Sequence, residues 1–349
     1  MNPYRPLGPR DFRTLKLMHG TISDPLIIQL ETQNADSDVN FEALSYVWGD
    51  PNDDDVAVSI LQLDSSMIKY RITKNLETAL RRIRLEHMDR SIWADAICIN
   101  QADISERSHQ VAMMGDIYRK ASRVVIWLGD DTNGTSKGID MLRHFVNPAG
   151  TKFQSPAYFT RSFLQTFAPP RTSTRSGAES QFSDDMQKSI RCVLSKPWFS
   201  RVWTVPEAVL SQRAMIQCGA NAVEWRNDFQ ELRKIRVRVK ATAISPQWKA
   251  IFQGQEVDLG PFLDLIEAQI REVALQNEIP IPEKDLLDIM YDFRYRQATD
   301  PRDKIYAMLS LAQSKRVQVQ VDVDYSETVE DAYKKLEKAL EELYGDLGI

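Results

Sequence analysis

The chain has 349 residues, of which 43% are apolar and 27% are charged, and its formal net charge is −5. This composition is typical of a folded globular protein, and the length is sufficient for two packed units. Basic residues are dispersed among acidic ones, which argues against a nucleic-acid partner because that would require a basic face.

The cysteines and histidines exclude two further classes of protein. Cys98, Cys192 and Cys218 are too few and too scattered for a disulfide framework. No apolar run approaches the roughly 18 residues of a membrane span. The four histidines show no metal spacing with the cysteines. We therefore expect a cytoplasmic protein without a metal site and without membrane association.

Residues 42–130 alternate between predicted strands and helices. Strands are expected at 42–48, at 91–94 and at 124–129 (VVIWLG), and a β-hairpin is expected at 56–63 and 66–72. Thr73 is a predicted N-cap, and Asp103-x-x-Glu106 resembles a capping box before a second helix. This order indicates right-handed crossovers and a mainly parallel sheet, whose binding crevice lies beyond the carboxyl ends of the strands.

The stretch WADAICINQ, residues 93–101, places three polar side chains at one predicted strand end. A ligand explains them if Asp95, Asn100 and Gln101 face a ribose or a phosphate in the crevice. A structural explanation is that Asp95 caps the turn, while Asn100 and Gln101 satisfy buried loop carbonyls. Both explanations remain open at this point.

The rest of the chain changes in character. Residues 148–183 are rich in Pro, Ser, Thr and Gly, which predicts a partly disordered surface insertion. A helix is expected at about 184–195 and a short strand at 214–219, and the chain is mostly helical from about residue 226. We divide it into residues 1–220, the α/β part, and residues 221–349, the helical part.

Several stretches together resemble the fungal heterokaryon-incompatibility (HET) domain. They are EALSYVWGD (42–50), LETALRRIR (76–84), SIWADAICINQADISERSHQVAMMGDIYRKASRVVIWLG (91–129) and FSRVWTVPEAVLSQ (199–212). ATDPRDKIYAMLSLA (298–312) and VDYS (323–326) resemble a segment that often follows this domain. One departure is Pro206, which stands where the family usually has Gln.

The resemblance implies a function in cell death after a non-self encounter. HET domains are thought to be distant relatives of TIR domains, so it also implies a TIR-like, flavodoxin-like sheet with a β-hairpin insertion. In active TIR domains a Glu in a Trp-x-x-x-Glu stretch cleaves NAD, and Trp203 and Glu207 have that spacing. The implied enzyme is an NAD glycohydrolase that requires no cofactor, uses NAD as substrate and self-associates on activation, under an upstream recognition protein or domain.

The chemistry requires one fixed carboxylate. Loss of nicotinamide from NAD expels a neutral group, so no general acid is needed, and a carboxylate stabilises the oxocarbenium-like transition state. Pro206 suits a first helical turn, where the helix dipole would keep Glu207 ionised. Glu207 is equally a plain helix-start or salt-bridging residue, so this assignment also has a structural alternative.

The remaining candidates would form the walls of a nucleotide pocket. Around Glu207 we expect the nucleotide-binding residues Ser45, Tyr46, Trp48, Gly49, Asp95, Asn100, Gln101, Arg201 and Trp203. Arg201 is suited to hold a phosphate but also to form a surface ion pair, and Trp203 is alternatively a core residue. The alternative to an enzyme is a non-enzymatic death-signalling module that acts by self-association or partner recruitment.

Overall fold

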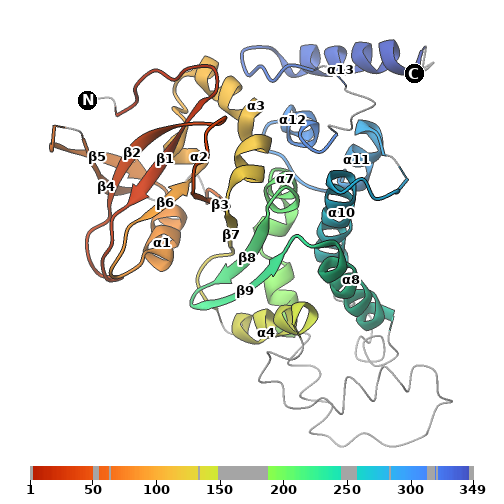
Figure 1. The fold of residues 1–349 in the computed structure, drawn as a ribbon, viewed down its shortest axis with the longest axis horizontal. Helices are drawn as coiled ribbons and strands as arrows, with labels where there is room; N and C mark the ends of the chain where they lie inside the picture. Colours follow the sequence, from red (N-terminus) through yellow and green to blue (C-terminus); the bar gives the residue numbers. More distant parts are fainter. Residues whose placement is uncertain are drawn as a thin grey trace, which may run out of the picture.

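The computed structural model describes residues 3–49, 55–62, 64–132, 134–147, 188–244, 258–282, 284–312, 319 and 321–345. Within these residues the strands form one nine-stranded sheet, in the order β5-β4-β2-β1-β6-β3-β7-β8-β9 (Figure 1). The strands are β1 (Asp11–Leu17), β2 (Ile27–Asn34), β3 (Glu42–Tyr46), β4 (Val56–Leu61), β5 (Met67–Ile72), β6 (Arg90–Trp93), β7 (Arg123–Trp127), β8 (Arg213–Cys218) and β9 (Asn221–Arg226).

The centre of the sheet agrees with the sequence expectation. Strand β3 pairs in parallel with both β6 and β7, and β7 pairs in parallel with β8. The expected hairpin is β4 and β5. The fold is therefore mixed α/β. A mainly parallel sheet was too broad an expectation, because β1–β2, β1–β6, β4–β5 and β8–β9 are antiparallel.

Strands β1 and β2 were not predicted from the sequence. Strand β1 lies inside the sheet, antiparallel to β6 on one side and to β2 on the other. Arg13 and Thr14 are both buried within it. A polar pair in the middle of a strand obscures the apolar pattern by which buried strands are found. Contacts made far along the chain, described below, are what allow Arg13 to be buried.

Helices fill the connections and most of the C-terminal half. They are α1 (Lys74–Ile83), α2 (Asp95–Cys98), α3 (Ile104–Lys120), α4 (Thr135–Val146), the 3₁₀ turn η2 (Pro197–Ser200), α7 (Thr204–Val209), α8 (Phe229–Ile244), α10 (Gly260–Gln276), α11 (Leu286–Asp292), α12 (Asp303–Leu309) and α13 (Val329–Tyr344). Thr73 caps α1 and Asp103 caps α3, as expected. Residues 188–194 are helical, in agreement with the helix expected near 184–195.

The C-terminal helices pack onto the sheet domain. Helix α7 contacts β3 and β7, and α10 contacts both α7 and α8, so that α7 is enclosed between the sheet and the C-terminal helices (Figure 1). The sheet continues beyond residue 220, because β9 pairs with β8. The expected insertion at 148–183 lies outside the described residues. In the part of the chain that is described, no helix has the length and apolarity needed to cross a membrane.

Candidate functional site

The stretch 93–101 forms one end of β6 and the short helix α2. The Asp95 carboxylate accepts hydrogen bonds from the Ala96 N–H at 2.8 Å and from the Trp48 indole at 2.8 Å. The Gln101 side chain donates to the Asp95 carbonyl at 3.1 Å. Gln101 therefore satisfies a loop carbonyl, as the structural explanation requires. Asp95 holds the helix start and also joins the two strand ends through Trp48.

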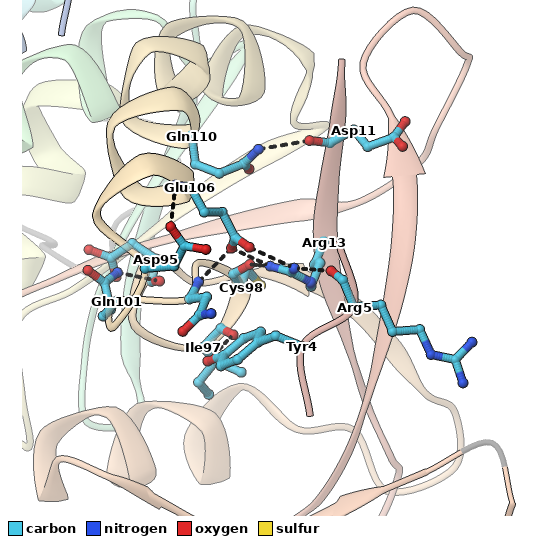
Figure 2. Close-up of polar contacts among 12 residues, drawn as sticks. Tyr4, Arg5, Asp11, Arg13, Asp95, Ile97, Cys98, Gln101, Glu106 and Gln110 are labelled. Atoms are coloured by element: carbon cyan, nitrogen blue, oxygen red, sulfur yellow. Dashed lines mark hydrogen bonds and ion pairs between the residues drawn. The ribbon is translucent and has the colours of Figure 1, made fainter. Parts of the chain in front are cut away.

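The same loop is fixed to β1 by a buried ion pair (Figure 2). Arg13, 2% exposed, donates to both carboxylate oxygens of Glu106, at 2.6 and 3.0 Å, and to the Cys98 carbonyl at 3.1 Å. Glu106 also accepts from the Asn100 N–H at 2.7 Å. The expected capping box is thus only half formed, since Asp103 accepts from the Glu106 N–H while the Glu106 carboxylate turns toward Arg13.

Glu207 lies next to the carboxyl end of the neighbouring strand, β3. Its carboxyl accepts a hydrogen bond from the Ser45 hydroxyl in β3, which in turn accepts from the Trp198 indole at 2.7 Å. The Tyr118 hydroxyl of α3 lies near the same carboxyl and influences its pKa, while it donates a long hydrogen bond of 3.5 Å to the Leu44 carbonyl. All four side chains are buried. Three parts of the chain, at Ser45, at Tyr118 and at residues 198–207, are therefore brought together around this one carboxyl group.

Burial changes the charge state expected for Glu207. Pro206 does lie in the first turn of α7, as predicted. However, burial raises the pKa of Glu207 from 4.5 to about 7, against the opposing effects of the Ser45 hydrogen bond and the Arg201 charge. The expectation of a fully ionised carboxylate was therefore wrong. A six-residue helix contributes less than the loss of hydration for a side chain only 6% exposed.

This raised pKa predicts a pH-dependent stability. The pKa of Glu207 is about 7 in the folded protein and 4.5 in the unfolded chain, so the folded state binds this proton more tightly. The resulting contribution to the free energy of unfolding is fully present below pH 4.5. It is lost as the pH rises through 7, by about 3 kcal/mol in total. Glu207→Gln should remove this component, so urea unfolding should show the variant gaining stability relative to wild type between pH 4.5 and 8. If the free energies of unfolding of wild type and variant differed by the same amount at every pH in that range, the raised pKa of Glu207 would be contradicted.

Arg201 lies close to several acidic groups. It donates to the Tyr46 carbonyl at 3.2 Å, and its charge lowers the pKa of both Asp95 and Glu207. Burial nevertheless raises the pKa of Asp95. The Tyr46 hydroxyl is buried, and its interaction with Asp95 falls outside ordinary hydrogen-bond geometry. The structure thus brings together one group of residues, which we call the Glu207 cluster: Ser45, Tyr46, Trp48, Asp95, Arg201 and Glu207.

The C-terminal region adds an acid that the sequence analysis did not single out. Asp303, at the start of α12, accepts from the Tyr325 hydroxyl at 2.6 Å and lies near Trp203, which lowers its pKa against the larger effect of burial. The C-terminal region also pairs with the segment before α7, because the Val202 N–H donates to the Gln297 carbonyl at 2.8 Å. The sequence did contain a signal for this pair, because Asp303 lies in the motif at 298–312 and Tyr325 lies in VDYS. Tyr118 lies within the motif at 91–129, whereas Trp198 lies just outside the motif at 199–212.

The remaining candidates lie at the margin of this cluster. Gly49 is exposed and has a φ of 106°, a left-handed conformation that favours glycine. Trp203 is half-buried and lines a cavity of about 250 Å³ together with Tyr118 and Pro206. Neither this cavity nor a larger one described below is lined by Glu207, Ser45 or Asp95. Among the described residues, no group of three or more His, Cys, Asp or Glu could hold a metal.

The two polar residues after α2 predict different mutational effects. Gln101→Ala should lower the free energy of unfolding by about 1–3 kcal/mol, because the Asp95 carbonyl loses its donor. Asn100→Ala is the matched control, since Asn100 is held through its backbone N–H. Urea unfolding should therefore show a small effect for this variant. Equal losses in the two variants would refute the structural function given to the Gln101 side chain.

Comparisons with known proteins relate the chain to one family. The profile of the Heterokaryon incompatibility protein (HET) family matches residues 41–207, which include β3, β6, α3 and Glu207. The chain is also 26% identical over 328 residues to "Heterokaryon incompatibility protein 6, OR allele" of Neurospora crassa, covering 86% of this chain and 47% of that protein. The chain therefore spans about half the length of this curated relative. No solved structure matches the chain described here.

Proposed function

The chain belongs to the heterokaryon incompatibility (HET) family, and from this we propose that it acts in fungal non-self recognition and the cell death that follows. We propose further that its sheet is a distant relative of the TIR core and that the protein works in the cytoplasm. Its biochemical activity is then cleavage of the nicotinamide–ribose bond of NAD. In this reaction Glu207 is the catalytic carboxylate.

One observation carries the enzymatic proposal. Glu207 is hydrogen bonded to Ser45 at the carboxyl end of β3, next to the parallel strand whose end leads to Asp95. That edge of an α/β sheet is where ligands bind. The guanidinium of Arg201 lies near both acids and is suited to a phosphate of the substrate. The group is thus polar, charged and placed where a nucleotide would enter.

Catalysis would require the cluster to open. Glu207 is only 6% exposed, enclosed by Trp198 and Tyr118 and by the helices that pack on α7. Assembly into a homo-oligomer, or a signal from an upstream recognition protein or domain, would provide the opening. In the open state the carboxyl loses its burial, its pKa falls toward 4.5, and the ionised form needed for the reaction becomes populated.

The same burial favours the second candidate function. A carboxyl that remains enclosed serves only to fix α7 against β3, and the protein would then signal death without catalysis, through self-association or recruitment of a partner. This alternative requires no access to Glu207. It predicts cell death with an unchanged cellular NAD content.

The deciding experiment is incubation of the purified protein with NAD over a range of protein concentrations. Chromatography should detect nicotinamide together with ADP-ribose or its cyclic form, with a specific activity that rises with protein concentration if assembly opens the site. Expression in fungal cells, with NAD and viability measured together, separates the two candidates. Death that precedes any fall in NAD would support the non-enzymatic module.

A further inference from the structure

The larger cavity lies away from the Glu207 cluster. Its volume is about 440 Å³, and it is formed mainly by α10, α11 and the residues after α11, while Val209 at the end of α7 contributes to its wall. Small-molecule sites commonly have volumes of about 300–1,000 Å³. The cavity is therefore of a size that accommodates a small organic ligand.

Each acidic side chain of its lining already has a partner. Glu267 pairs with Arg236 and Lys240, Glu272 pairs with Arg119, and Asp292 pairs with Lys284. Asp264 accepts from the Tyr295 hydroxyl. Among the basic residues, Lys284 is neutralised by Asp292, and Arg294 stacks on the Tyr291 ring at 3.9 Å and donates to its carbonyl.

Arg271 is the exception. Its side chain lines the cavity and is half-buried, yet it forms no hydrogen bond or ion pair with any residue that the structure describes. Burial lowers its pKa, and the charges of Asp292 and Asp288 oppose this only from a distance. A guanidinium without a partner in a partly enclosed space favours an anion, and its planar fork matches a carboxylate with two parallel hydrogen bonds.

The other lining residues define the rest of the ligand. Val209, Ala268, Ile289, Phe293 and Leu311 provide an apolar surface. Asp264, which has no basic partner among the described residues, would repel a dianion such as a phosphate monoester more strongly than a monoanion. A single negative charge is therefore the best match to Arg271, the lining cation that has neither a hydrogen bond nor an ion pair in the described part of the chain.

We propose that this cavity, the Arg271 cavity, binds a small monocarboxylate with an apolar body, whose carboxylate pairs with Arg271. The inference does not depend on NAD cleavage, because no residue of the Glu207 cluster lines the cavity. The ligand would nevertheless touch Val209, two positions after Glu207 in the same helix. Occupancy of the Arg271 cavity would thus fix the far end of α7.

The test is calorimetric titration of the full chain with hexanoate and octanoate. Their amides serve as neutral counterparts and hexyl phosphate as the dianionic one. We expect saturable binding of at least one carboxylate, with weaker binding of hexyl phosphate and of both amides. An amide or the phosphate that binds as tightly as the carboxylates would overturn the proposal, and so would a folded wild-type protein that binds neither carboxylate.

Substitutions of Arg271 test whether its guanidinium binds the carboxylate. Arg271→Gln should weaken carboxylate binding by about 10–100-fold, the effect of losing a charged hydrogen-bonded pair. Arg271→Lys should have an intermediate effect because it keeps the charge but loses the fork. Arg226→Gln, at an exposed position of β9 outside the cavity, should leave binding unchanged. If Arg271→Gln fails to fold, Arg271→Lys still decides the question, since unchanged affinity in that variant would exclude two-point recognition by the guanidinium.

Discussion

Glutamine in place of Glu207 is expected to lower the rate of nicotinamide release by about 10²–10³-fold or more, the usual effect of removing one electrostatic catalytic group. The substitution preserves the side-chain volume and leaves an oxygen to accept from Ser45. It removes the negative charge that stabilises an oxocarbenium-like transition state. Nicotinamide release should be measured by chromatography on protein that unfolds cooperatively.

The burial of Glu207 separates this effect from a loss of folding. Above pH 7 the wild-type protein buries a charge, with its pKa raised to about 7, whereas the variant does not. The variant should therefore be at least as stable there, so that a fall in rate reports on chemistry. Glu330→Gln, which removes a carboxylate from an exposed ion pair with Lys334, is the matched control and should be fully active. Undiminished NAD cleavage by folded Glu207→Gln protein would remove this residue from the mechanism.

Loss of the Glu106 charge is expected to destabilise the fold by about 3–5 kcal/mol, the cost of leaving a buried charge without its partner. In Glu106→Gln, the Arg13 guanidinium stays 2% exposed within β1 but no longer faces a carboxylate. The hydrogen bond to the Asn100 N–H is weakened as well. Urea unfolding followed by circular dichroism measures the change.

Two comparisons make this result specific. Glu330→Gln breaks an exposed ion pair, for which about 0–1 kcal/mol is expected. Adding Arg13→Met to Glu106→Gln should recover part of the loss, because the uncompensated charge is then removed. A loss below about 1 kcal/mol in Glu106→Gln would mean that water reaches the pair and that the loop at 95–101 does not depend on it.

The local elements were determined by the sequence itself. Strand β7 follows from a continuous apolar run, β3 and β6 follow from shorter apolar stretches, and the β4–β5 hairpin follows from alternation. Thr73 and Asp103 cap their helices because a cap requires only a side-chain oxygen two or three residues before a free N–H. Such signals involve only a few neighbouring residues, so strands and helix caps can be predicted from them without knowledge of the fold. The candidates also came from short signals, Glu207 from the motif of the family resemblance and Ser45 and Asp95 from the ends of two predicted strands.

Only the tertiary structure decided how these parts meet. Strand β1 escaped prediction because Arg13 is buried through Glu106, which lies 93 residues later in the chain. The hydrogen bonds of Ser45 with Trp198 and with Glu207 join segments separated by 153 and 162 residues. The charge state of Glu207 was misjudged for the same reason. A helix dipole can be inferred from neighbouring residues, whereas the loss of hydration that raises the pKa to about 7 depends on every element that packs around the carboxyl group.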